Sequence, residues 1–188
     1  MKKFNLITAV LLTCVSCFSQ DKGFISISLG TSTPIGDFSS SQSNNKSAGY
    51  ANAGLCADLS AGYKYSKYFG FCSSLIGQLN KTDASSIAFQ LINTIPSASS
   101  VKVNAGAWKT AGVRIGEYVC FPISENFNIQ AHLMIGFFNV STPEILYNIT
   151  ADNQSIWIKQ YSASAKSFSY SAGISARYNV SKHLCLIA

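Results

Sequence analysis

The fold is decided by residues 168–180, which read Phe168-Ser169-Tyr170-Ser171-Ala172-Gly173-Ile174-Ser175-Ala176-Arg177-Tyr178-Asn179-Val180. Apolar side chains occupy every second position, and the positions between them hold serine, glycine, arginine or asparagine. Successive side chains of a β-strand point to opposite faces, whereas an amphipathic helix needs an apolar residue every three or four positions. The stretch therefore predicts a strand with one apolar and one polar face.

The same alternation runs through 53–65 and 127–137. These stretches exceed the about 5–6 residues of an average strand and match the about 9–11 tilted residues that cross a bilayer. The sequence predicts an all-β chain whose strands begin near Phe24, Tyr50, Tyr68, Ala107, Asn126, Lys166 and His183.

An internal repeat fixes where the chain turns. Three similar segments, 63–71, 121–129 and 178–186, each carry an apolar alternation into a short polar turn at Ser66, Ser124 or Ser181 and resume it afterwards. This is the pattern of a tight hairpin. The polar stretches 33–49, 81–106 and 141–165 predict long loops, so that short turns alternate with long connections.

The N-terminus has the features of an export signal. Lys2 and Lys3 precede an apolar run, 6–14, and small residues follow up to Ser19. We therefore expect a cleaved signal peptide, 1–19, and one domain, 20–188. The segment 11–14 loosely resembles a lipobox, which leaves a lipid-anchored protein as an alternative. No apolar run of about 18 residues follows, so any membrane span would have to be a strand.

Composition narrows the class of protein. Only 12% of the 188 residues are charged, against about 25% in an ordinary soluble domain. The net charge of +6 comes from scattered basic residues, so nucleic-acid binding is not expected. Four cysteines follow the predicted cleavage site, and they predict either a disulfide, with Cys72–Cys120 the candidate pair, or small apolar side chains within strands. These cysteines are Cys56, Cys72, Cys120 and Cys185.

Three features favour a barrel that faces lipid with its apolar side over a soluble barrel or sandwich. The polar face is rich in glycine and serine with few charges, and short turns at one end oppose long loops at the other. Aromatic residues gather at the short turns, where a membrane-interface band is expected. They are Tyr63, Tyr65, Tyr68, Phe69, Tyr118, Phe121, Phe127 and Tyr178.

On these hairpins, roughly 23–188, the chain resembles the small outer-membrane β-barrel domain family, which includes the OmpA transmembrane domain and OmpX. The resemblance implies an antiparallel, up-and-down, eight-stranded transmembrane barrel in the bacterial outer membrane. It also implies contact with outer-membrane lipid and insertion by the outer-membrane assembly machinery. Two features depart from the family. The last strand stops at Ala188, so we expect an eighth strand in a continuation, and Glu117 falls on the lipid-facing side unless a bulge between Ile115 and Val119 re-aims it.

No catalytic, cofactor or metal motif is recognisable, and we expect no enzyme. Five residues are expected to form a polar network inside the barrel: Asp58, Lys64, Arg114, His132 and Arg177. A Ser/His hydrolase using His132 and an ion site are the rival interpretations of this set. For the whole protein we expect a structural or surface-interaction role with an unidentified external partner. The alternatives are a narrow channel for small solutes and a secreted or lipid-anchored β-sandwich.

Overall fold

The structure is a computed structural model that describes residues 22–151, 154–181 and 184–187. The predicted signal peptide, 1–19, and the lipobox-like segment lie outside these residues. The larger of two antiparallel sheets has the strand order β1-β2-β3-β5-β6-β9-β10. Its strands are β1 (Gly23–Ser32), β2 (Ala51–Lys64), β3 (Phe69–Thr82), β5 (Ala107–Pro122), β6 (Phe127–Ser141), β9 (Ser164–Asn179) and β10 (Cys185–Ile187). The seven predicted strands are thus confirmed.

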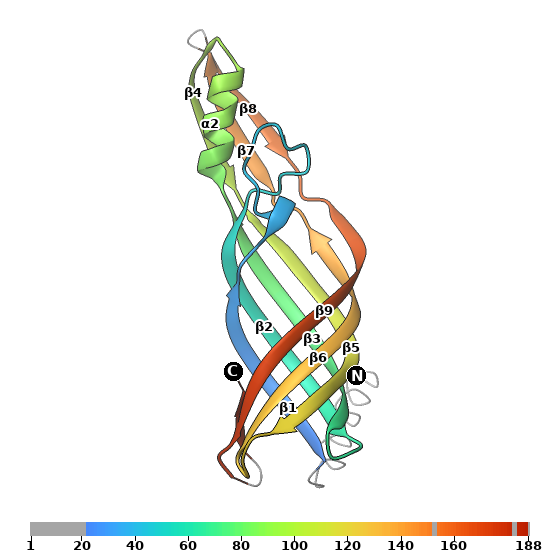
Figure 1. Cartoon of the computed structure of the whole chain (residues 1–188). Coiled ribbons are helices and arrows are strands. Elements are labelled where there is room, and N and C mark those ends of the chain that lie inside the picture. Colours follow the sequence, from blue (N-terminus) through green and yellow to red (C-terminus); the bar gives the residue numbers. More distant parts are fainter. Residues whose placement is uncertain (1–21, 152–153, 182–183, 188) are drawn as a thin grey trace, which may run out of the picture.

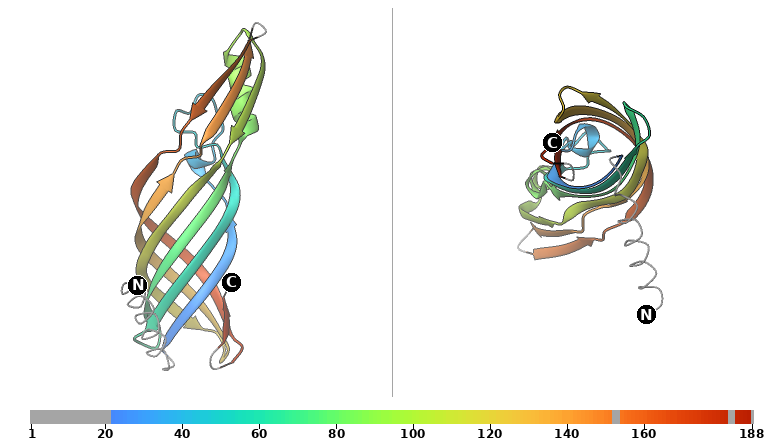
Figure 2. Two further views of the ribbon diagram at one scale, coloured as in Figure 1. Left: turned by 180° about the vertical axis from the view of Figure 1, so that it is seen from behind. Right: turned by 90° about the horizontal axis from the view of Figure 1, so that it is seen from below.

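This sheet curls around an axis (Figures 1 and 2). The ring centroid of Phe24 on β1 lies 5.9 Å from that of Tyr118 on β5, and the Arg177 guanidinium on β9 lies 4.3 Å from the Phe24 ring. Because β1 neighbours neither β5 nor β9 in the sheet, these contacts are made across its concave side. Within the described residues the edge strands β1 and β10 do not pair with each other, and an eighth strand is not seen.

The two faces of the curled sheet have opposite character. Large apolar side chains on the convex face are exposed, including Leu133 (70%) and Ile174 (79%). Polar side chains on the concave face are buried, including Ser74 (5%) and Asn80 (2%). The period-two pattern of the sequence produces this division directly, since each strand sends alternate side chains to each face.

The repeat serines stabilise the short turns. Each hydroxyl oxygen accepts a hydrogen bond from the backbone N–H three residues later, in the pairs Ser66 with Phe69 (2.9 Å), Ser124 with Phe127 (3.1 Å) and Ser181 with Leu184 (3.2 Å). A side-chain oxygen that accepts a nearby N–H mimics a backbone turn. This bond gives the repeat a physical basis, because it fixes the chain reversal at one end of the sheet.

Two of the three long connections, 81–106 and 141–165, are not simple loops, and the prediction is wrong for them. Residues 33–49 contain η1 (Gly36–Phe38), and 81–106 contain α2 (Ala84–Thr94) and β4 (Ala98–Ala105). Residues 141–165 contain all of β7 (Ile145–Ala151) and β8 (Gln154–Gln160), and β4-β7-β8 form a second sheet. This small sheet and α2 extend beyond the end of the curled sheet opposite the short turns (Figure 1). No helix in the described segments is long and apolar enough to cross a membrane.

Two residue placements also differ from expectation. Tyr118 does not belong to the aromatic band: it is 3% exposed on the concave face, because it shares the parity of Arg114 and Gly116. Glu117 is not re-aimed by a bulge, since β5 pairs in unbroken register with both neighbouring strands. Its side chain is exposed on the convex face, opposite Phe71 and Leu133.

Candidate functional site

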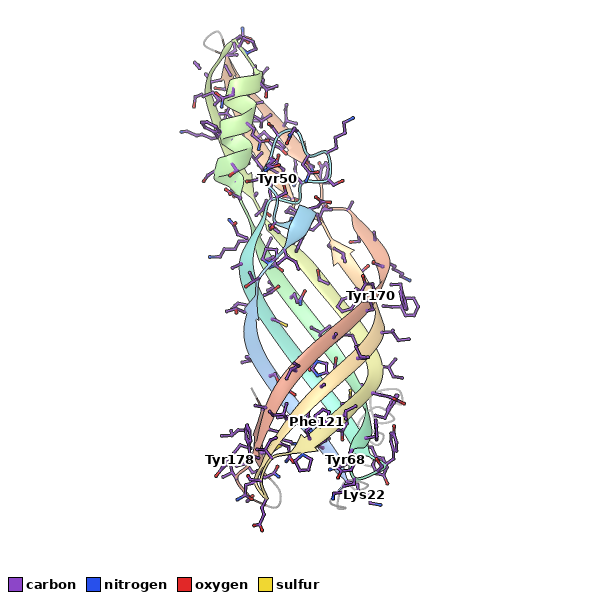
Figure 3. All side chains as sticks on the ribbon, in the orientation of Figure 1. Lys22, Tyr50, Tyr68, Phe121, Tyr170 and Tyr178 are labelled. Carbon is purple, nitrogen blue, oxygen red and sulfur yellow. The ribbon has the colours of Figure 1, made fainter. Side chains whose placement is uncertain are left out.

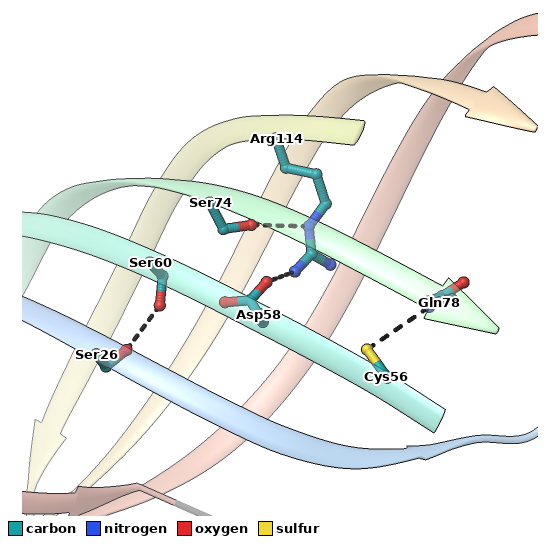
Figure 4. Close-up of polar contacts among 7 residues, drawn as sticks. All are labelled: Ser26, Cys56, Asp58, Ser60, Ser74, Gln78 and Arg114. Carbon is teal, nitrogen blue, oxygen red and sulfur yellow. Dashed lines mark hydrogen bonds and ion pairs between the residues drawn. The ribbon is translucent and has the colours of Figure 1, made fainter. Parts of the chain in front are cut away.

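An ion pair links two strands across the middle of the concave face. Arg114 on β5 approaches Asp58 on β2, with 2.7 Å between Nη2 and Oδ2, and its Nε donates a hydrogen bond of 3.0 Å to the Ser74 hydroxyl on β3 (Figure 4). The two charged side chains retain 18% and 17% of their exposure. Since β3 lies between β2 and β5, its small serine leaves room for the arginine to reach across.

Small polar groups surround this ion pair. The Ser26 and Ser60 hydroxyls are 2.7 Å apart between β1 and β2, and Gln78 Nε2 lies 3.9 Å from Cys56 Sγ (Figure 4). Serine, cysteine and amide side chains can fill a narrow interior while satisfying one another's hydrogen bonds. The result is a polar interior in which the opposite charges of Asp58 and Arg114 cancel.

His132 lies on the same face but packs against a neighbouring strand. A Cβ atom added at Gly173 on β9 would lie 2.4 Å from His132 Nε2, so the imidazole occupies the space that any other side chain at 173 would need. The two residues are directly paired between β6 and β9. The pairing of Gly173 with His132 therefore has a steric reason, because glycine leaves room for the imidazole ring.

Arg177 belongs to a separate cluster near the short turns. Its guanidinium lies over the Phe24 ring and donates to Cys185 Sγ at 3.3 and 3.2 Å. The Phe24 ring in turn makes an edge contact with Tyr118. Tyr118 packs with Cys72, Cys120 and Met134 into the buried apolar core of the described chain.

The structure therefore divides the five residues expected to form one network. It brings Asp58 and Arg114 together, places His132 against Gly173 and places Arg177 on Phe24. Lys64 shares the inward parity of β2 but makes none of the ion pairs found in the described segments. Sequence reasoning missed Phe24 and Tyr118 as interior residues, although their parity with the polar positions of their strands was the available signal.

The cysteines give no disulfide in this structure. All four that are described are free, and Cys72 and Cys120 are both buried. Cys72 pairs with Gly116, so Cys120 lies four residues farther along β5, or about 13 Å at the rise of a strand. A bridge requires Cα atoms less than about 7 Å apart. The interpretation as small apolar side chains within strands fits their positions.

The described polar side chains of this interior are held by an ion pair, hydrogen bonds and ring contacts. No group of three or more metal-ligating side chains occurs in the part of the chain that the structure describes. The chain matches no protein-family model and no curated protein sequence. The distribution of side chains over the two faces of the curled sheet is therefore the feature from which a function can be inferred.

Proposed function

We propose that this protein is an outer-membrane β-barrel protein with a structural or surface-interaction role. The observation that carries the proposal is the inverted distribution of side chains on the curled sheet, with large apolar groups exposed on the convex face and polar groups buried on the concave face. Membrane barrels have this arrangement, because lipid contacts the outside and side chains fill the inside. A soluble sandwich requires the reverse.

Energetics support a lipid environment for the convex face. Burying one Leu or Ile side chain is worth about 1.5–3 kcal/mol, and exposed examples occur on every long strand of the sheet. A continuous apolar surface of this kind would drive association in water. The exposed Leu, Ile and Val side chains of the convex face include Ile27, Leu29, Leu55, Leu59, Leu75, Leu79, Val113, Ile115, Leu133, Ile135 and Ile174.

The ends of the sheet fit the same proposal. Tyr68, Phe121 and Tyr178 gather at the end with the short turns, as an interfacial aromatic band would (Figure 3). The small sheet and α2 extend from the opposite end, where external loops are expected. We propose that 1–19 directs export, that the assembly machinery inserts the barrel into outer-membrane lipid, and that the external part makes surface contacts.

Membrane insertion sets one condition on this proposal. Every backbone N–H and C=O within hydrocarbon must be paired inside the protein. The outer edge of β1 and most of the outer edge of β9 have no strand beside them in the described residues, since β10 pairs only with 177–179. The proposal therefore requires additional strand pairing between these edges in the membrane.

The interior argues against the channel alternative. The Arg114–Asp58 ion pair, His132 and the Phe24–Tyr118 contact all occupy space on the concave side. Small barrels are only wide enough to be filled by their own side chains. We expect the purified protein to show no single-channel conductance in planar bilayers, and a defined conductance would favour the channel.

The direct test is the behaviour of the purified full chain with lipid. We expect it to co-float with phospholipid vesicles, to resist extraction by high salt and alkali, and to show heat-modifiable gel mobility, because a folded membrane barrel resists unfolding by detergent at room temperature. A protein that stays monomeric and folded without detergent, and does not co-float, would contradict the proposal.

A further inference from the structure

A cleft of about 640 Å³ lies where the curled sheet meets the small sheet. We call it the junction cleft. Its lining comes from residues far apart in sequence: 43–50, the end of β3, α2, the start of β5, and β7 with β8. The size falls within the about 300–1,000 Å³ of sites that hold small ligands. It is separate from the concave-face cluster around Asp58.

Helix α2 and the small sheet, which together we call the extension, form the walls of the cleft. On α2, Ile87, Gln90, Leu91 and Thr94 are spaced at three and four residues, so they share one helical face. On the small sheet, alternate residues of β7 and β8 share the face opposite, and they are Ile145, Tyr147, Ile149, Ile158 and Gln160. The helix packs over β4, which leaves the β7–β8 part of this face as the floor of the cleft.

Tyr50 enters the cleft from a strained backbone position. Its φ is 51°, and it is the one non-glycine residue of the described chain with positive φ. This region costs an L-residue about 1–2 kcal/mol, and such strain persists mainly at functional sites. Three hydrogen bonds hold the residue: its N–H donates to Ser40 (3.0 Å), its C=O accepts from Asp83 (2.7 Å), and its hydroxyl donates to Gln90 Oε1 (2.6 Å).

The lining of the cleft is uncharged but keeps free hydrogen-bonding capacity. None of the described lining residues is Asp, Glu, Lys, Arg or His. The Tyr50 and Tyr147 hydroxyls donate to Gln90 and Gln160 respectively, so their oxygens remain able to accept. Gln160 Nε2 finds no acceptor within the described segments, so it remains able to donate. Burial and the nearby Tyr50 raise the pKa of Tyr147, so its hydroxyl stays neutral.

We propose that the junction cleft binds a neutral small molecule with an aromatic or aliphatic body and one or two hydroxyl or amide groups. The Ile, Leu and Trp108 side chains would contact the body, and Tyr50, Tyr147 and Gln160 would orient its polar groups. An ion would lose its hydration here without gaining a counter-charge. The site lies at the end of the curled sheet that carries α2 and the small sheet, away from the apolar convex face, so it does not depend on how that face meets lipid.

The test uses three probes that share one ring and differ in charge: para-nitrobenzyl alcohol, para-nitrobenzoate and para-nitrobenzylammonium. The chain has two tryptophans, so a Trp157→Phe background leaves Trp108, in the cleft, as the reporter. We expect saturable quenching by the alcohol, with a Kd at least about tenfold lower than for either ion. The same result is expected in detergent and in lipid nanodiscs, which separates this inference from the membrane proposal.

Matched variants locate the site. We expect Tyr147→Phe to raise the Kd for the alcohol about three- to tenfold through the lost hydrogen bond, while Tyr161→Phe, outside the cleft, leaves it unchanged. Thr94→Phe should fill the cleft and abolish saturation, whereas Asn93→Phe on the exposed side of α2 should not. Quenching that is linear in probe, equal for the three charges, or equal in the Thr94 and Asn93 variants would overturn the proposal.

Discussion

On the concave face, the Arg114 and Asp58 side chains stabilise each other's charge. Both side chains retain less than a fifth of their exposure, so each charge depends on the other and on Ser74 for the hydrogen bonds that water would supply. Removing one partner of a buried pair leaves an uncompensated charge, whereas removing both is often tolerated. The pair should therefore be strongly coupled in stability measurements.

We expect Asp58→Asn to lower the free energy of unfolding by about 1–3 kcal/mol. The double variant Asp58→Asn, Arg114→Met should recover part of this loss. Urea titration followed by gel mobility of four proteins, the wild type, Asp58→Asn, Arg114→Met and the double variant, completes the double-mutant cycle. The exposed Lys159–Glu144 pair, at 3.0 Å, is the control, and Lys159→Met should change stability by less than about 1 kcal/mol. Equal effects from both pairs would contradict the assignment of Asp58 to a confined interior.

Glu117 is the exception to the apolar convex face. It lies between Phe71 and Leu133, where a carboxylate in a bilayer would be costly. If this face contacts lipid, Glu117→Leu should raise the free energy of unfolding in vesicles by up to about 2 kcal/mol. Glu125→Gln, in an exposed short turn, should have no such effect. Unchanged or lower stability of the Leu variant would mean that the carboxylate has a favourable environment.

At the scale of the element, α2 depends on its N-cap residue, Asp83, which directly precedes Ala84. Asp83 Oδ1 accepts from the Ser86 backbone N–H at 3.0 Å, and the Ser86 hydroxyl donates to Oδ2 at 2.7 Å. These bonds, the backbone bond first, lower the pKa of Asp83. A lowered pKa in the folded state means that the ionised carboxylate stabilises the helix. This contribution is complete above the ordinary carboxyl pKa and is lost as the pH falls through the lowered one.

We expect Asp83→Ala to destabilise α2 by about 0.5–2 kcal/mol, because the cap is lost. Amide exchange at Ile87, whose N–H donates to the Asp83 carbonyl at 3.3 Å, reports this local opening. Asp83→Asn is the matched variant: asparagine caps about as well as aspartate, so stability at neutral pH should be retained while its dependence on acid pH disappears. The same acid dependence in Asp83→Asn would assign the titration to another group.

The sequence predicted the elements of the curled sheet well because their alternation is long. From 168 to 180 every second residue is apolar. The period-two pattern therefore repeats often enough to identify a strand with one apolar face from the sequence alone. The strands β7 and β8 are half as long and carry serine, asparagine and threonine, so their period was too short to separate from loop composition. For α2, Asp83 followed by Ile87 and Leu91 was a usable but brief signal.

The candidate sites were predictable to a lesser extent. Strand parity placed Asp58, Arg114 and His132 on one face, but which side chains meet depends on strand register and curvature, which a single sequence does not specify. The junction cleft could not be predicted from the sequence, because its lining residues, from Ser43 to Gln160, are brought together by a second sheet. Tyr50 gave no advance sign of a strained backbone, since positive φ there follows from its three hydrogen bonds.

At the scale of the molecule, the small sheet grows directly out of the curled one. β4 precedes β5 with only Gly106 between them, and β4 and β7 pair through Ala105 and Ile145. The Gly106 N–H donates to the Glu144 carbonyl at 2.8 Å, and the Thr82 hydroxyl donates to the Gly106 carbonyl at 2.7 Å. Backbone bonds therefore join the extension to the curled sheet, and the cleft forms at this joint.

The orientation of the curled sheet in its solvent can be tested by single-cysteine labelling after removal of the native cysteines. If the convex face contacts lipid, cysteine at Leu133, Ile174 or Leu59 should react with a lipid-soluble maleimide in vesicles and resist a charged one. Arginine at these positions should cost about 2–4 kcal/mol near the bilayer midplane.

Ser175, Ser60 and Gln130 are the matched positions, because Ser175 and Ser60 each follow an outward site by one residue and Gln130 is directly paired with Ser175. Their side chains share the concave face with Ser74, so arginine there meets polar groups and is limited by space and charge balance. In a soluble sandwich these serines would face water and the leucines a core. Rapid, complete labelling of Ser175 and Ser60 cysteines by a charged, impermeant maleimide in detergent-free solution would therefore rule out the membrane orientation.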